Sequence, residues 1–163
     1  MSSIGGPSYE KLTFHPAISQ LRYGIVYSEW NSAVTHALRD GAAELLQSLG
    51  VPAENIVLMD VSGAFELPMG TQYLADIAKV DGVIAIGCLI KGETPHFHYI
   101  SEVVSHRLSE LALQKNLPVG FGLLTVNTDE EATERAGGKH GNKGIEAAEA
   151  VVRLLSHSLE LSQ

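Results

Sequence analysis

A histidine stands where a polar turn meets a predicted amphipathic helix. Residues 87–100 leave an apolar, strand-like run at 82–86, cross a turn rich in small residues, and enter the helix at about His96. Backbone N–H groups and the positive dipole end at a helix start attract an anion. The same dipole favours neutral imidazole, which accepts a proton near pH 7. These residue types indicate an anionic substrate and a proton-transfer role for His96.

Metal binding is the alternative reading of the same histidines. His96 and His98 form a His-x-His pair, with His106 further along the predicted helix. No cysteine or acidic residue accompanies them at matching ligand spacing. We therefore favour proton transfer over a metal site.

A second group of residues is basic. Arg135, Lys139 and Lys143 recur every four residues in an otherwise acidic chain. Four glycines interrupt the series, at positions 137, 138, 141 and 144. Donors, positive charge and close backbone approach are what an organic phosphate needs. A solvated surface loop is an equally good interpretation of this pattern alone, and the spacing is not that of a P-loop.

Two further side chains follow predicted strands. Trp30, the only tryptophan, either stacks on a planar heterocycle or packs the start of a helix against the core. Glu66 either accepts hydrogen bonds from substrate hydroxyls or caps the helix that follows it.

These residues need a scaffold, and the hydrophobic pattern predicts one. Strands are expected at 22–27, 56–61, 82–86 and 119–124. Helices are expected from 32 to 49, up to about 79, and over 96–116, 129–136 and 145–159. Alternating strands and helices imply an α/β fold with a parallel sheet, right-handed crossovers and helices on both faces. The loops at the carboxyl ends of the strands should then converge on one edge, where ligands bind.

Composition limits the function classes. A length of 163 residues favours one domain over 1–163, with residues 1–20 as an N-terminal arm and a short strand at about 9–14. The net charge of −8 opposes general binding of nucleic acid or anionic lipid. Cys88 is the only cysteine, which favours a reducing compartment. No long apolar run or secretion signal is evident, so a cytoplasmic protein without membrane spans is expected.

Four blocks in order resemble the 6,7-dimethyl-8-ribityllumazine synthase family of riboflavin biosynthesis. They are GAFELP (63–68), KGETPHF (91–97), FGLLT (121–125) and ERAG with NKG (134–144). The resemblance covers about 21–155 and implies a three-layer, flavodoxin-like sandwich with a four-stranded parallel sheet. It also implies a transferase that condenses 5-amino-6-(D-ribitylamino)uracil with 3,4-dihydroxy-2-butanone 4-phosphate, releasing phosphate and water without metal or cofactor.

The resemblance assigns roles to this chain's residues. His96 matches the proton-transfer histidine, and Gly92, Glu93 and Thr94 match the turn that holds phosphate. Trp30 takes the position of the aromatic that stacks on the pyrimidine, with Asn31 beside it; Ala64 and Glu66 match the pair lining the ribityl chain. The family's site lies between subunits, so Phe121, Arg135, Lys139 and Lys143 are expected from a neighbour, with Arg135 gripping phosphate.

The resemblance also implies assembly. Family members form pentamers in which the N-terminal arm adds a strand to a neighbour's sheet, and many stack into an icosahedral 60-mer. The compact loop at 137–144 resembles that of the shell formers. Pro16 in the arm leaves pentamer and shell both open.

Three residues depart from the family pattern. Glu29 stands where arginine is common, Ser62 where proline is common, and His98 where an acidic residue is common. The last change predicts slower turnover, and Trp30, commonly Phe, predicts riboflavin binding. Two alternatives follow: a non-catalytic flavin-binding shell of the same fold, or an archaeal-type riboflavin synthase.

Overall fold

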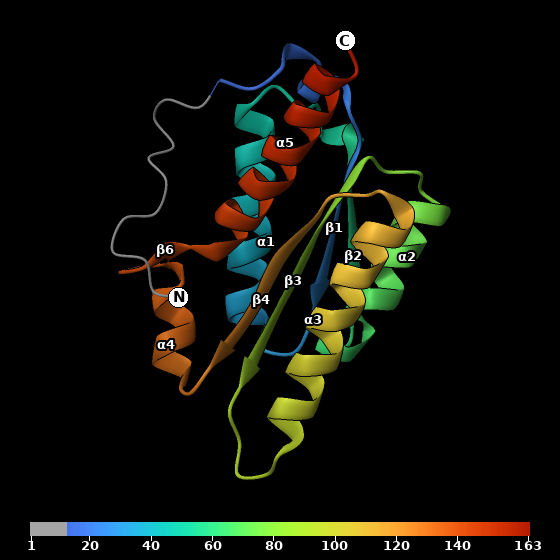
Figure 1. The fold of residues 1–163 in the computed structure, drawn as a ribbon. Helices are drawn as coiled ribbons and strands as arrows, with labels where there is room; N and C mark the ends of the chain where they lie inside the picture. The colour runs from blue at the N-terminus through green and yellow to red at the C-terminus, as the bar shows by residue number, and fades with distance from the viewer. Residues whose placement is uncertain (1–12) are drawn as a thin grey trace.

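Four parallel strands form the centre of the fold (Figure 1). The computed structural model describes residues 13–163. The strands are β1 (Tyr23–Ser28), β2 (Ile56–Val61), β3 (Gly82–Ile90) and β4 (Val119–Val126), in the order β2-β1-β3-β4. This is the predicted parallel α/β sheet, and it confirms the flavodoxin-like architecture for the described residues.

Helices cover both faces of the sheet (Figure 1). They are α1 (Ser32–Ser48), α2 (Leu67–Asp76), α3 (His96–Lys115), α4 (Asp129–Glu134) and α5 (Lys143–Leu161). One apolar cluster joins α1 and α5 to one face, and a second joins α2 and α3 to the other. The result is the expected three-layer sandwich.

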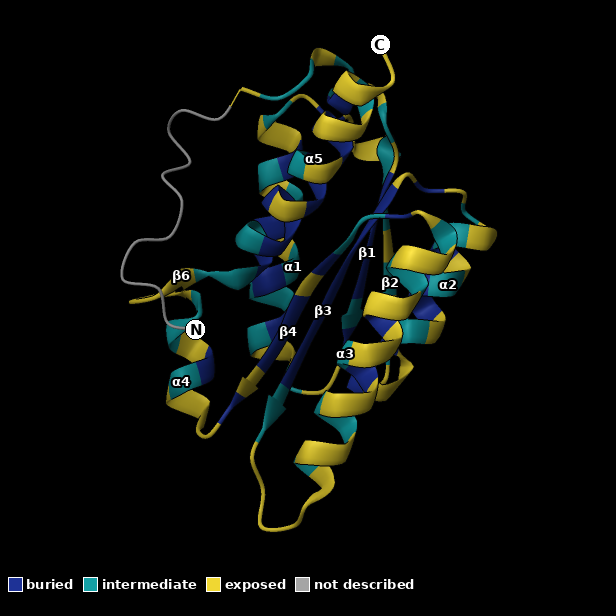
Figure 2. Cartoon of the chain, viewed as in Figure 1, coloured by how far each residue is buried: buried dark blue, intermediate teal, exposed yellow. Residues whose placement is uncertain are grey.

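The burial of each strand follows its position in the sheet. Every residue from Gly82 to Cys88 is buried, because β3 has a strand on each side and helices on both faces (Figure 2). At the edge of the sheet, β2 alternates between partly buried and exposed residues, with Leu58 exposed. The continuous apolar run is thus the sequence signal of the interior strand that leads to His96.

Glycine permits two close approaches around α5. A Cβ added at Gly144 would lie 2.0 Å from the carbonyl oxygen of Leu38, so only glycine allows α5 to approach α1 this closely. A Cβ at Gly120 of β4 would lie 2.3 Å from the carbonyl oxygen of Ala147. Asn142 adds a polar link, since its Nδ2 donates to Ala37 O at 3.0 Å while its Oδ1 caps α5.

Element boundaries differ from the prediction in several places. The strands β3 and β4 continue four and two residues further than 86 and 124, because Cys88 pairs with Leu124 and Ile90 with Val126. The helices α2 and α4 end earlier, at Asp76 and Glu134. The apolar pattern of 96–116 also predicts a buried Val103, but this residue is 39% exposed, whereas Val104 and Leu108 of α3 are buried.

The predicted glycine loop after α4 is a β-hairpin. It consists of β5 (Ala136–Gly138) and β6 (Gly141–Asn142), paired antiparallel. Gly137 and Gly141 have φ of 105° and 75°, a backbone region that side chains disfavour. The glycines therefore shape a turn.

The two ends of the described chain meet beside α5. A 3₁₀ helix (Pro16–Gln20) buries Ile18, so this part of the predicted arm packs on its own chain. The His15 backbone N–H donates to Ser156 Oγ at 2.7 Å, and the side chains of His15 and Gln163 hydrogen-bond at 2.7 Å. The predicted strand at 9–14 lies almost wholly outside the described residues.

Candidate active site

A pocket of about 760 Å³ opens at the carboxyl ends of β1 and β3. It is lined by five predicted site residues: Trp30, Asn31, Ala64, Glu66 and His96. Three of the four predicted strand-end loops thus converge, as the topology rule requires. The remaining lining residues are Ser62, Gly63, Phe65, Cys88, Leu89, Ile90 and Ile100.

Trp30 stands as an exposed wall of this pocket. Its backbone N–H donates to Ser62 O at 3.1 Å, and that of Glu29 donates to Val61 O at 2.8 Å, so the β1–β2 ladder continues past the strand ends. The Trp30 residue is nevertheless 73% exposed. This exposure favours the stacking interpretation over core packing, because a ring that held the helix to the core would be covered.

Asn31 turns the chain from β1 into α1. Its backbone is left-handed (φ 60°, ψ 45°), and its side-chain Nδ2 donates to Cys88 O at 2.9 Å. The side chain of Asn31, a predicted substrate-binding residue, therefore hydrogen-bonds to β3 in this structure.

Glu66 belongs to a short 3₁₀ turn, η4 (Ala64–Glu66), that leads into α2. Its Oε2 accepts the backbone N–H of Gly63 at 3.0 Å, as in a capping box. The capping interpretation is confirmed, yet the residue is exposed at the pocket and its carboxylate is not consumed by an ion pair among the described residues. Binding of hydroxyls stays a prediction.

His96 is the first residue of α3 and lines the pocket from that helix. His98 stacks edge-on against Phe97 at 5.4 Å and is not among the lining residues. Side chains two positions apart on a helix point to different sides. Within one chain, His98 is therefore not placed to orient His96.

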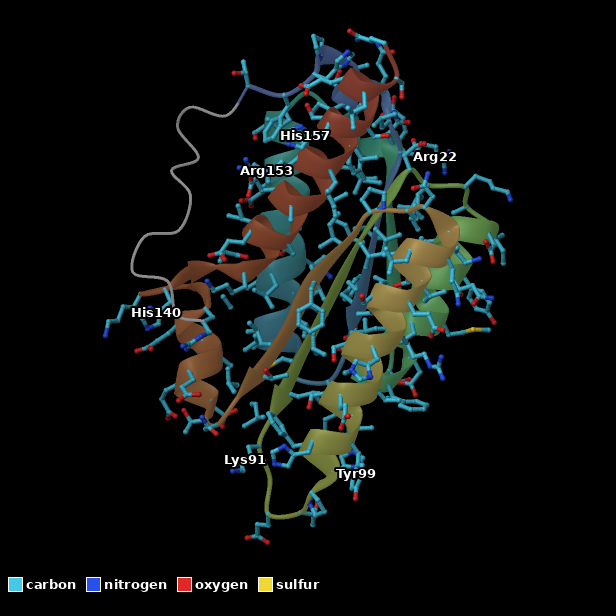
Figure 3. All side chains as sticks on the ribbon, in the orientation of Figure 1. Arg22, Lys91, Tyr99, His140, Arg153 and His157 are labelled. Atoms are coloured by element: carbon cyan, nitrogen blue, oxygen red, sulfur yellow. The ribbon has the colours of Figure 1, made fainter. Side chains whose placement is uncertain are left out.

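The turn before α3 is exposed and lies outside the pocket lining. Gly92, Glu93 and Thr94 are solvent-facing, and an added Cβ at Gly92 would meet no atom within 4 Å. Figure 3 shows Lys91 and Tyr99 at the two ends of this turn region, at one extremity of the molecule. In a single chain the turn forms an open rim above His96.

The basic residues lie elsewhere. The side chain of Arg135 folds back to donate to Glu131 O at 2.9 Å, and Lys143 forms an ion pair with Glu146 at 2.8 Å. Lys139 is exposed in the hairpin next to His140, which Figure 3 places well apart from Lys91 and Tyr99. Phe121 is 52% exposed on β4. One chain does not bring these four residues into the pocket.

The apolar wall that β3 gives to the pocket was not predicted from the sequence. Leu89 and Ile90 line it because β3 extends beyond the predicted end. Cys88 also lies here; burial, and secondarily the negative charge of Asp129, raises the pKa of its thiol to about 11. The raised pKa favours the neutral thiol at physiological pH, as is typical of a structural cysteine. The apolar run at 82–90 was the sequence signal for this wall.

The described residues form neither a metal cluster nor a membrane span. Among residues 13–163, no three His, Cys, Asp or Glu side chains gather as a metal ion would require. Over the same residues, none of the helices combines the length and apolar character needed to cross a bilayer.

Several known proteins similar to this chain carry the same name. The sequence model described as 6,7-dimethyl-8-ribityllumazine synthase matches residues 20–158. A protein of that name from Cytophaga hutchinsonii is 46% identical over 144 residues, covering 88% of this chain and 91% of the relative. One from Porphyromonas gingivalis is 47% identical over 139 residues, with 85% and 86% coverage. One from Parabacteroides distasonis is 43% identical over 143 residues, with 88% and 89% coverage. This chain therefore belongs to the 6,7-dimethyl-8-ribityllumazine synthase family.

Proposed function

We propose that this chain makes 6,7-dimethyl-8-ribityllumazine from 5-amino-6-(D-ribitylamino)uracil and 3,4-dihydroxy-2-butanone 4-phosphate. The observation that carries the proposal is the convergence of Trp30, Glu66 and His96 on one pocket in a chain of this family. An aromatic ring suits stacking on the pyrimidine, a carboxylate suits the hydroxyls of the ribityl chain, and a histidine suits the proton transfers of the reaction. The reaction is a transfer in riboflavin biosynthesis.

Each residue has a role in this scheme. Trp30 stacks on the pyrimidine ring, while Ala64 and Glu66 accommodate the ribityl chain. His96 moves protons during imine formation, loss of phosphate and ring closure. In this proposal positioning supplies much of the rate enhancement, and neither metal nor cofactor takes part.

The phosphate requires charges that the pocket lacks. None of the twelve lining residues, all in the described part of the chain, is Lys or Arg. A phosphate dianion is bound best by a bidentate arginine with further cations and backbone N–H groups. We assign Arg135, Lys139, Lys143 and Phe121 to a neighbouring subunit, where they face the rim of Gly92, Glu93 and Thr94.

This division of the site implies an assembly. A pentamer repeats one head-to-tail contact around a ring. The pocket of each subunit therefore faces one neighbour, and its residues Arg135, Lys139 and Lys143 face the pocket of the other. The N-terminal arm adds a strand to a neighbour's sheet, and pentamers stack into an icosahedral 60-mer. A pentamer-sized particle in sedimentation at physiological ionic strength would refute the shell.

The decisive test combines the two substrates with the purified assembly. Lumazine fluorescence and an equal amount of released phosphate are expected, and a chelator should not reduce the rate. Absence of product with intact flavin binding would instead indicate a flavin-binding shell. Conversion of added lumazine to riboflavin would indicate riboflavin synthase activity. Fractionation of the source cell, with activity expected in the cytoplasm, tests the localisation.

A further inference from the structure

Asn31 has an unusual conformation for the residue that immediately precedes a helix. The residue that caps a helix N-terminus usually has an extended backbone, and its side-chain oxygen accepts an N–H of the first turn. Asn31 is instead left-handed, and no side-chain hydrogen bond caps α1. Only its backbone carbonyl serves the helix, accepting the N–H groups of Val34 at 2.9 Å and Thr35 at 3.1 Å.

The side chain is directed across the sheet instead. Its Nδ2 donates to the carbonyl of Cys88, a residue of β3 that is 57 positions away in the chain. Cys88 and the two residues after it form one wall of the pocket. The amide thus joins the β1–α1 turn to the wall from which the chain leads to His96.

Trp30, the preceding residue, is held from the other side. Its N–H donates to Ser62 O, in the loop that carries Ala64 and Glu66. Consecutive residues therefore bind the two opposite walls of the pocket, Ser62 through the backbone of Trp30 and Cys88 through the side chain of Asn31. The Trp30 residue is 73% exposed, so the position of its ring depends strongly on the backbone that these two hydrogen bonds hold in place.

We propose that Asn31 is a positioning residue: its amide, by donating to Cys88 O, holds the ring of Trp30 at a defined separation from the β3 wall. The consequence for catalysis rests on the proposed function, because the position of the Trp30 ring relative to His96 matters only if a planar substrate stacks on that ring. The positioning itself does not depend on the reaction. Loss of the hydrogen bond from Asn31 to Cys88 weakens binding of the pyrimidine substrate more than that of the butanone phosphate, which has no ring to stack.

The only tryptophan of the chain is the ring in question, so tryptophan fluorescence reports on Trp30 alone. Two variants of the full chain test the positioning role of Asn31. Asn31→Gly retains the left-handed backbone and removes the amide. Asn31→Asp retains the size and tolerates the same backbone, but replaces the N–H donor by an acceptor that opposes the Cys88 carbonyl.

Asn116 offers a matched control. It is also a left-handed asparagine (φ 48°), at the end of α3 and away from the pocket lining. Asn116→Gly should leave Trp30 unchanged.

Both Asn31 variants should increase the amplitude of fast ring motion in time-resolved anisotropy and the accessibility of Trp30 to acrylamide. The KM for the pyrimidine substrate should rise about fivefold to tenfold, the equivalent of one hydrogen bond, while that for the butanone phosphate changes less than about twofold. Anisotropy and quenching identical to the unmodified protein would overturn the positioning role, whatever the kinetics. Altered fluorescence in a protein whose unmodified form makes no lumazine would instead sustain the positioning role and reject the proposed function.

Discussion

The carboxylate of Glu66 accepts the backbone N–H of Gly63 at 3.0 Å at the edge of the pocket. One side chain thus stabilises the loop that forms a pocket wall and presents negative charge to the pocket. The two roles can be separated because an amide oxygen also caps a helix, whereas it accepts hydrogen bonds from hydroxyls more weakly than a carboxylate.

We expect Glu66→Gln to retain the stability of the protein and Glu66→Ala to lower the free energy of unfolding by about 1 kcal/mol. Both should raise the KM for the pyrimidine substrate, with Glu66→Gln raising it by about threefold or more. Urea unfolding and steady-state kinetics on the same preparations provide the two measurements. An unaltered KM in Glu66→Gln would show that the carboxylate serves the loop alone.

Substitution of His96 and of Arg135 should affect different kinetic constants. His96→Ala removes the proton carrier and should lower kcat about 100-fold or more. Arg135→Ala should mainly raise the KM for the butanone phosphate, about tenfold or more. His106→Ala, from the same helix, and Arg22→Ala, at the far end of the molecule from Lys91 in Figure 3, are the controls. Unchanged saturation by the phosphate substrate in Arg135→Ala would disprove the phosphate role.

Trp30 should bind flavins through its exposed face. Riboflavin fluorescence should fall on titration with the protein, and Trp30→Phe should weaken the affinity about threefold to tenfold, since a smaller ring offers less stacking area. Tyr99→Leu removes an equally exposed aromatic of α3 that does not line the pocket, and should have no effect. Flavin fluorescence that persists unquenched would contradict the expectation.

Stability should decline in alkaline solution because of Cys88. Burial raises its pKa from 9.0 to about 11, so the unfolded chain releases the thiol proton first. The contribution of the buried, neutral thiol to the free energy of unfolding is complete below pH about 9. It is lost between pH about 9 and 11, at up to about 1.4 kcal/mol per pH unit. Burial also raises the pKa of Tyr23, whose contribution declines only at higher pH.

Urea unfolding at pH about 8 and about 10 should show this loss, and Cys88→Ala should reduce the difference between the two pH values. An equal difference in the two proteins would mean that the thiol ionises alike in the folded and unfolded chain.

Gly144→Ala should disrupt the contact between α1 and α5. The new Cβ would lie 2.0 Å from Leu38 O, a backbone atom that cannot move without shifting a helix. A loss of about 2 kcal/mol or more in the free energy of unfolding is expected. Gly92→Ala, where a Cβ meets nothing within 4 Å, is the control for stability. Equal stability of the two variants would show that the helices separate at little cost.

The hydrophobic pattern predicted the fold well because each strand carries its own signal. The buried run of β3 and the alternation of β2 are local properties, and topology then brings strand-end residues such as Trp30 and His96 together. Strand ends were less predictable. Gly87 resembles the beginning of a turn, yet pairing of Cys88 with Leu124 and Ile90 with Val126 extends both strands.

Side-chain direction within the site was also beyond sequence reasoning. An asparagine before a helix predicts a cap, whereas Asn31 donates to a strand that is distant in sequence. Arg135 folds back on Glu131, while His96 lines the pocket, and no local sequence pattern predicted that one chain would keep them apart. Only the family resemblance supplied that division.

The pairing of His15 with Gln163 has a practical consequence. It places the carboxyl end of the chain at the extremity opposite to the turn that leads into α3 (Figure 1). A fluorophore, affinity tag or cargo protein joined after Gln163 would therefore leave the pocket mouth unobstructed. A short polar spacer after Gln163 would leave its side chain free to keep the hydrogen bond to His15 in such a fusion.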